Sequence, residues 1–514
     1  MIRRNILHAL LLLAAFSLTS CSGVPKTGGG GGGGTATVSF TLVADTPPTS
    51  FSILSFKVTI ASITLTPTSG TAQTFIPASS SPIDLARLQS DTAFLGSLAN
   101  VPAGTYTVQV SLSSSTIVFA NSSGSTIVAG STNCPDQAPN VTICTATLSS
   151  TGTPTITSFT FAAASGGNQG IELDFNLNNA FTLTNGTLTV NLAPAPPASG
   201  VLSAFTLPRT NANLGSGQLE IIEDFTGVVS LSGNTVTITK SGSNVSSTLA
   251  ATESSTSFFD ASPDGTLCPT PATFSCVKSG QIASVDAFLN SNGTLALKEF
   301  EPLTSTQVDL VEGTVVLITN ATQFVIAVTD ETPAATGSLI GSVTTGQFLT
   351  VNLATVPTLK PFLVDTKGLA VSTFPQTLNN FASQTDTTAI HPGQNVMVHV
   401  TSFTAAVGTT PASVTVDTVT LRWSRFSAAV QTAGSPSFTI TNLPSYFTFT
   451  AASLFGVQSF IGTAGTDGIT NFDGVTDGTG LTITTPPVGM RALFLENTAL
   501  SANPVFFAAK VRQQ

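Results

Sequence analysis

Short stretches in which apolar and polar residues alternate recur along most of the chain, and they limit the fold more than any other feature. In the first stretch, Val38, Phe40 and Leu42 alternate with polar residues, and residues 107–112 and 187–192 repeat the pattern. A period of two residues predicts β-strands with one buried face. Long runs at helical spacing do not occur in the sequence. We therefore predict an all-β fold.

The length and the changes in composition divide the chain into parts. Its 514 residues are too many for one hydrophobic core, because a single domain usually holds about 150 residues. We expect an N-terminal β-sandwich followed by several small β-barrel or β-sandwich modules. The predicted parts are a signal peptide (1–20), a glycine-rich tether (21–36), the sandwich (37–195), small β modules in a loose repeat (196–360) and a C-terminal β region (361–514).

The N-terminal residues are typical of an export signal. Arg3 and Arg4 precede an apolar core at residues 6–16, which is too short to cross a bilayer as a helix. The following Leu-Thr-Ser-Cys resembles the lipobox of bacterial lipoproteins. This resemblance implies that the Cys21 thiol is acylated and that Cys21 becomes the first residue of the mature chain. The alternative is an ordinary signal peptide with a coincidental cysteine.

The lipobox also implies a location for the protein. Acyl chains on Cys21 would anchor it to a membrane of the bacterial cell envelope, and Ser22 resembles the residue that directs lipoproteins to the outer membrane. The glycine run at residues 28–34 lies in a segment that predicts a flexible coil with a reach of roughly 20 Å. The folded part is therefore expected to lie close to the membrane surface.

The composition restricts the partners of the chain. Only 8% of the residues are charged, and without Arg3 and Arg4, 14 of the 16 basic residues remain against 26 acidic ones. This negative balance makes nucleic acid a poor partner. The 34 Phe against two Tyr and one Trp argue against a dedicated sugar-binding surface, since Phe lacks a polar tip. We expect Trp423 to pack in a core with Val419 and Leu421 instead of stacking on a ligand.

Four cysteines remain once Cys21 is acylated. They form two close pairs in separate regions of the chain, so we predict disulfides between Cys134 and Cys144 and between Cys268 and Cys276. Each bond would close a short loop and stabilise the fold by roughly 2.5–3 kcal/mol. Zinc binding is the alternative, but paired zinc ligands are usually separated by only about two to four residues, and these spacings are wider.

Two motifs besides the lipobox point to a family of exported bacterial proteins. A Pro-Ala-Gly-Thr-Tyr turn lies at residues 102–106, and a Leu-Asp-Phe strand lies at residues 173–175. With the lipobox and the first strand, they resemble domain of unknown function 4382 over about residues 37–192. That resemblance implies a β-sandwich in a surface or periplasmic lipoprotein, and it implies no activity or functional residue.

A loose internal repeat follows the sandwich. Gly227, Gly280 and Gly337 lie 53 and 57 residues apart, and each precedes a predicted strand. Repetition at this period favours small β modules in series. The pattern is similar to domain of unknown function 5666, whose units resemble small open barrels.

The common catalytic motifs are absent from the sequence. Gly-x-Ser-x-Gly, Gly-x-x-x-x-Gly-Lys and His-Glu-x-x-His do not occur, so we predict that the protein is not an enzyme. One alternative is a hydrolase of unrecognised type in which His399 acts as a general base with an acid such as Asp386. The other interpretation of His399 is a polar residue on a solvated strand face.

Pairs of acidic residues are a second candidate for chemistry. Two carboxylates on one face can act together in glycoside hydrolysis. Such pairs are also typical of a solvated strand face, and this is what we expect here. The pairs are Glu172 with Asp174, Glu220 with Glu223, and Glu299 with Glu301.

An Asp- and Gly-rich segment is the best candidate for a metal site. Asp467, Asp473 and Asp477 lie among glycines, and calcium takes about six to eight oxygen ligands of the kind that such a loop supplies. The spacing differs from the EF-hand pattern, and Asp-Gly is common in hairpin turns, so turns are the other interpretation. No other cofactor is predicted.

These features predict a lipoprotein anchored in the envelope, with a structural, adhesive or partner-binding role and no catalytic site. Its expected partners are the membrane, through the lipid anchor, and an envelope protein or a polysaccharide. The first alternative is an accessory polysaccharide-binding lipoprotein, with calcium as an optional ligand. The second alternative is the unrecognised hydrolase.

Overall fold

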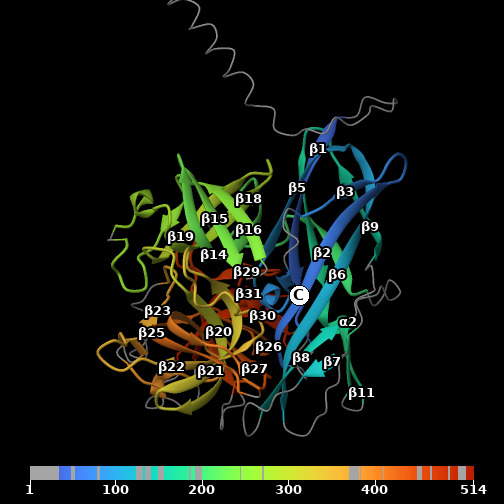
Figure 1. The fold of residues 1–514 in the computed structure, drawn as a ribbon. Coiled ribbons are helices and arrows are strands. Elements are labelled where there is room, and N and C mark those ends of the chain that lie inside the picture. Colours follow the sequence, from blue (N-terminus) through green and yellow to red (C-terminus); the bar gives the residue numbers. More distant parts are fainter. Residues whose placement is uncertain are drawn as a thin grey trace, which may run out of the picture. The chain divides into compact units, whose positions relative to one another are not determined.

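Strands make up nearly all of the regular structure in the computed structural model, which confirms the all-β prediction (Figure 1). The signal peptide, Cys21 and most of the tether lie outside the described residues. Within the described part, no helix is both long enough and apolar enough to cross a membrane. Residues 35–514 form one unit. The structure describes residues 34–513 except for 48–51, 78–81, 123–130, 134–140, 149–154, 185–186, 191–199, 243–244, 269–270, 370–380, 383, 409, 448–453, 464–465, 484–486 and 496–504.

The first two sheets form the predicted β-sandwich. One sheet contains β1 (Thr35–Ala44), β5 (Ala93–Pro102), β10 (Asn168–Phe175) and β13 (Leu202–Leu207). Its strand order is β13–β10–β1–β5, and the central strands β1 and β10 run parallel. Because β1 has a neighbour on both sides and a second sheet over one face, nearly all of its residues are buried.

The second sheet is built around two long antiparallel strands, β2 (Ser52–Pro67) and β6 (Gly104–Ser122). Phe40 from the first sheet and Phe56 from the second lie in the same hydrophobic core, as expected for a sandwich. The Pro-Ala-Gly turn leads into β6, where the Tyr106 hydroxyl donates a hydrogen bond to the Pro102 carbonyl at 2.6 Å. The shorter strands are β3 (Gln73–Phe75), β4 (Ile83–Asp84), β7 (Ser131–Asn133), β8 (Val141–Leu148) and β9 (Thr155–Ala163).

The sandwich ends later than predicted. β13 pairs with β10, with Leu207 opposite Gly170, so this unit continues past residue 195. The segment at residues 191–199, which contains the predicted boundary at residue 195, lies outside the described residues. Three small elements lie between β10 and that segment: the helix α2 (Leu177–Ala180) and the hairpin strands β11 (Phe181–Thr184) and β12 (Thr187–Val190).

Three further sheets follow, and each closes into a five-stranded barrel with a sixth short strand at one edge. Barrel 1 contains β14 (Gln218–Ser232), β15 (Thr235–Gly242), β16 (Val245–Thr252), β17 (Phe258–Phe259), β18 (Ile282–Asn290) and β19 (Leu295–Thr304). Barrel 2 contains β20 (Leu310–Asn320), β21 (Gln323–Thr332), β22 (Phe348–Leu353), β23 (Leu363–Val364), β24 (Asn395–Thr404) and β25 (Ala412–Arg422). Barrel 3 contains β26 (Ser424–Thr432), β27 (Ser437–Thr441), β28 (Phe455–Ser459), β29 (Asn471–Asp473), β30 (Val488–Leu495) and β31 (Val505–Arg512).

The three barrels share one topology, so the chain does contain a repeat. In barrel 1 the order is β16–β15–β14–β18–β19–β17, and a parallel contact between β16 and β19 closes the barrel. Barrels 2 and 3 repeat this order strand for strand. The predicted period of 53–57 residues is wrong, because Gly227 on β14 and Gly280 before β18 belong to the same barrel.

A different glycine pattern recurs before several strands, because one type of turn is used several times. A Gly-Gln pair precedes β18, β22 and β24, and the three glycines have positive φ angles of 88°, 86° and 94°. In each turn the Gln side chain accepts a hydrogen bond from the backbone N–H three residues earlier, at 2.6, 3.1 and 2.8 Å. The pairs are Gly280-Gln281, Gly346-Gln347 and Gly393-Gln394.

The predicted boundary at residue 360 falls inside barrel 2, between β22 and β23. Barrels 2 and 3 instead meet at Trp423, the single residue between β25 and β26. Trp423 is fully buried in the core of barrel 2 with Val419 and Leu421, which confirms its predicted packing.

We expect the substitution Gly393→Ala to destabilise the protein more than Gly280→Ala. Both glycines have a positive φ, so a Cβ strains the backbone by about 1 kcal/mol at either position. At Gly393 the added Cβ would also lie 2.1 Å from the Phe447 ring, whereas at Gly280 it meets nothing within 4 Å. Overpacking of this kind adds about 1–3 kcal/mol. Urea unfolding would measure the difference, and equal losses for both variants would contradict the assigned contact.

Candidate functional site: a buried charged junction

The few charged residues of this chain lie mainly inside it. More than half of the 26 acidic residues are buried, together with Lys367, Arg422, Arg491, Lys510 and Arg512. Burying an unpaired charge is very unfavourable, so each of these groups needs a partner. All three predicted acidic pairs are buried as well, and the expectation that they lie on solvated strand faces is wrong.

Asp224 is the centre of this buried network. It lies at an irregularity of β14 and has a positive φ of 57°, which turns it away from the regular ladder. Its carboxylate accepts hydrogen bonds from Arg425, from Arg422 at 3.2 Å and from Lys367 at 3.4 Å. Burial alone would raise the pKa of Asp224, but the cations Lys367, Arg425 and Arg422 hold it well below its usual range. One carboxylate of barrel 1 thus pairs with cations from barrels 2 and 3.

The sandwich joins the same network through the loop after the 3₁₀ helix η1 (Arg87–Gln89). Arg425 donates to Asp91 through Nε at 2.6 Å, and Arg512 donates through Nη1 to the carbonyls of Leu88 and Asp91 at 2.8 and 2.9 Å. Arg512 also donates to Asp473 at 2.7 Å within barrel 3. Two arginines of barrel 3 therefore hold the sandwich loop.

Glu223, the residue before Asp224, extends the network into barrel 3. Its carboxylate accepts hydrogen bonds from Lys510, from Arg491 at 3.3 Å and from Asn471 at 3.1 Å. Consecutive strand residues normally point to opposite faces. The irregularity between Ile222 and Phe225 is what allows both Glu223 and Asp224 to reach buried cations.

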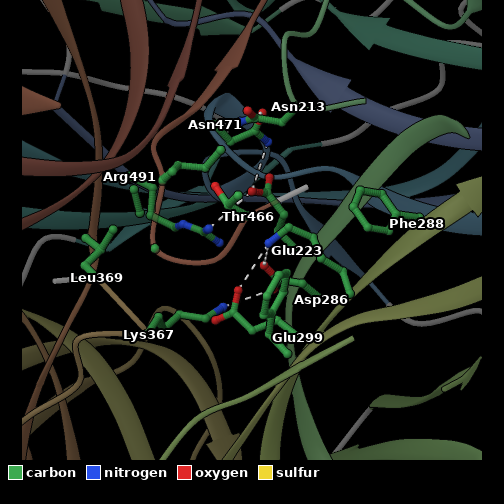
Figure 2. Close-up of a pocket in the computed structure, with 15 residues that line it drawn as sticks. Asn213, Glu223, Asp286, Phe288, Glu299, Lys367, Leu369, Thr466, Asn471 and Arg491 are labelled. Carbon is green, nitrogen blue, oxygen red and sulfur yellow. Dashed lines mark hydrogen bonds and ion pairs between the residues drawn. The ribbon is translucent and has the colours of Figure 1, made fainter. Parts of the chain in front are cut away.

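A small cavity lies within this junction. Figure 2 shows Lys367, Asp286 and Arg491 around it, and Lys367 donates a hydrogen bond to Asp286 at 3.0 Å. Lys298 donates to Glu299 at 3.2 Å on the same wall. The cavity measures about 40 Å³, which is room for a few water molecules and not for an organic substrate. It is therefore a hydrated part of the junction.

Carboxyl groups also pair with one another in the junction. Asp260 lies beside Glu299, and Glu301 lies beside Asp365. Burial and the neighbouring carboxyl raise the pKa values of Asp260 and Glu301 well above their usual range.

The structure does not gather the three aspartates of the predicted calcium site. Asp467 is half-buried beside Gly368, Asp473 is paired with Arg512, and the Asp477 side chain accepts a hydrogen bond from the Thr479 N–H at 2.8 Å. Among the described residues, no group of three or more His, Cys, Asp or Glu side chains is placed to hold a metal ion. The positions of these aspartates give the calcium prediction no support.

His399 does have an acidic partner, but a different one from the residue predicted. Its Nδ1 lies 2.7 Å from Asp417 Oδ1, across strands β24 and β25, and the pair is half-exposed. Asp386 instead accepts a hydrogen bond from the Thr388 N–H at 2.9 Å. The pairing of His399 with Asp417 could not be predicted from the sequence, because it depends on the register between the two strands.

One predicted disulfide is present in barrel 1. Cys268 and Cys276 are bonded, with sulfur atoms 2.00 Å apart, and close the loop between β17 and β18, so zinc binding there is wrong. Cys144 lies buried on β8. Its predicted partner Cys134 lies outside the described residues, and that pairing stays a prediction.

We expect Asp224→Asn to destabilise the protein by about 3–5 kcal/mol. Asparagine keeps the size and tolerates the positive φ, but it removes the one carboxylate that Arg425, Arg422 and Lys367 share. Asp477→Asn is the matched control. The Asp477 side chain accepts a hydrogen bond from the Thr479 N–H, a capping contact that Asn makes as well as Asp does, so stability should change by less than about 0.5 kcal/mol. Urea unfolding measures both, and similar values for the two variants would contradict the role of the network.

We expect stability to fall by about 2 kcal/mol as the pH rises from 5 to 8. Burial raises the pKa of Glu331 to about 7 and that of Asp467 to about 6, so the folded state binds more protons than the unfolded state in this window. Asp286 behaves differently, because Lys367 and Lys298 lower its pKa. The stability that its ionised carboxylate contributes is lost only below about pH 4. Urea unfolding across the window measures the slope.

The double variant Glu331→Gln with Asp467→Asn is the control for that slope. Its stability should depend less on pH between 5 and 8, because two of the carboxyls with raised pKa values are gone. A slope as steep as that of the unaltered protein would show that other groups are responsible.

The comparison with known families agrees with the sequence motifs of the sandwich. The model of the domain of unknown function 4382 matches residues 35–194, which cover the sandwich except for β13. No curated protein and no solved structure matches the chain. The relation of the barrels to domain of unknown function 5666 stays a prediction. The resemblance of the N-terminal sandwich to domain of unknown function 4382 is thus confirmed.

Proposed function

We propose that the chain is an exported bacterial lipoprotein that holds a rigid group of β units at the cell envelope for binding a protein or polysaccharide partner. The observation that carries this proposal is the buried junction around Asp224, where charges from barrels 1, 2 and 3 meet. Separating the units would expose or isolate these charges. The units therefore move as one body, which suits a protein that presents a fixed surface.

The described residues favour binding over catalysis. The cavity at the junction is too small for a substrate, and its charged groups are paired with one another. The His399–Asp417 pair lies half-exposed on a barrel wall. The excess of acidic over basic residues disfavours nucleic acid as the partner.

A polysaccharide partner is the second candidate, and barrel topology favours it. Closed five-stranded barrels include folds that bind oligosaccharides on a strand face and its adjoining loops. This argument is an analogy between folds, since one fold supports many functions. Binding to a panel of envelope polysaccharides, with and without calcium, would separate this candidate from a protein partner.

Replacement of Cys21 tests the anchor. We expect Cys21→Ala to abolish acylation and to move the protein from the membrane fraction to the soluble fraction, because one cysteine carries all of the acyl chains. Labelling with a tagged fatty acid and cell fractionation measure both effects. Ser22→Ala is the matched control and should still be acylated. A Cys21→Ala protein that stays in the membrane fraction would overturn the proposed anchor.

A further inference from the structure

A second and much larger cavity lies between the sandwich, barrel 1 and barrel 2. It measures about 420 Å³, which is within the range of about 300–1,000 Å³ typical of small-molecule sites. Its walls come from η1 and β5 of the sandwich, from β14 and β16 of barrel 1, and from β21 and the residues after it in barrel 2. The junction described above forms its floor.

Three of the five acidic residues that line this cavity are paired with cations. Asp91, Glu223 and Asp224 line it, but each pairs with cations of the junction that lie behind the wall. Asp84 accepts hydrogen bonds through Oδ1 from the backbone N–H groups of Phe56 and Ala86, at 2.7 and 3.0 Å. These carboxylates therefore do not make the cavity a cation site.

Two of the three cations that line the cavity share a single carboxylate. Arg87 and Lys240 share one carboxylate oxygen, Asp330 Oδ2, at 3.1 and 2.6 Å. Lys57 donates to a neutral group, the Thr345 carbonyl, at 2.5 Å. Burial lowers the pKa of Lys57 in spite of the nearby carboxyls Asp84 and Glu331, so its charge lacks full compensation. Three of the few basic residues of the chain thus meet at one cavity.

The rest of the lining is suited to an apolar body with a polar contact. Phe94, Phe225 and Leu249 supply apolar surface from the sandwich and barrel 1. Thr226 also lines the cavity, and its buried hydroxyl, like Asp84 Oδ2, has no hydrogen-bond partner among the described residues. A buried polar atom without a partner is rare in folded proteins and indicates a group that something else satisfies.

We propose that this cavity binds a small amphipathic anion, with its anionic group at Lys57, Arg87 and Lys240 and its apolar body against Phe94, Phe225 and Leu249. An anionic group at this place would give Arg87 and Lys240 a second counter-charge beside Asp330 and would give Lys57 a direct anionic partner. The apolar part would displace water from the aromatic wall. This site is independent of the lipid anchor and of the partner proposed above.

The fluorescent probe 8-anilinonaphthalene-1-sulfonate, an amphipathic anion, tests the site on residues 35–514, which form one unit. We expect saturable binding to the folded protein and displacement by decanoate. The double variant Lys57→Met with Lys240→Met should bind the probe at least tenfold more weakly. Lys278→Met, at an exposed position outside the cavity, should bind it unchanged.

Two further measurements separate the site from nonspecific binding. Ser247→Trp places a bulky ring at the cavity wall and should also abolish binding while leaving the urea unfolding midpoint close to that of the unaltered protein. The uncharged 1-decanol should displace the probe at least tenfold less effectively than decanoate does. No saturable binding, equal binding by all variants, or equal competition by 1-decanol would each overturn the proposal.

Discussion

A buried carboxylate requires its counter-charge, and in this protein the counter-charges come from other units of the chain. Asp224 of barrel 1 contacts Lys367 and Arg422 of barrel 2 and Arg425 of barrel 3. Arg425 reaches on to Asp91 of the sandwich. Since removing one partner from a buried pair is far more unfavourable than never burying the pair, the four units depend on one another. This mutual dependence defines their arrangement, and the cavities follow from it.

The low charge content of the sequence therefore has a structural meaning. Thr and Ser take surface positions, and the charged residues concentrate where units meet. In such an interior the acids outnumber the bases, and burial beside another carboxyl raises the pKa values of Asp260 and Glu301. The stability of the junction consequently depends on pH near neutrality as well as at acidic pH. A junction made of Phe and Leu would lack that sensitivity.

The sequence predicted what local pattern controls and missed what distant partners control. Alternation identified the strands, the turn at residues 102–106 identified the start of β6, and the aliphatic neighbours of Trp423 identified its core. The same alternation cannot tell a solvated face from a face covered by another unit. Glu223 and the Lys510 side chain that it binds are 287 residues apart, so no local signal marks Glu223 as buried. The spacing of glycines likewise predicted a repeat, but the true period of the repeat depends on strand pairing.

The position of Arg512 on the last described strand has a consequence for how the protein is made. The ribosome completes the sandwich loop that carries Leu88 and Asp91 long before it reaches β31. Until that strand arrives, the carbonyls of Leu88 and Asp91 lack the donor groups of Arg512, although Arg425 is already available to the Asp91 carboxylate. The contacts between the sandwich loop and barrel 3 are therefore completed only after the preceding barrels have been synthesised.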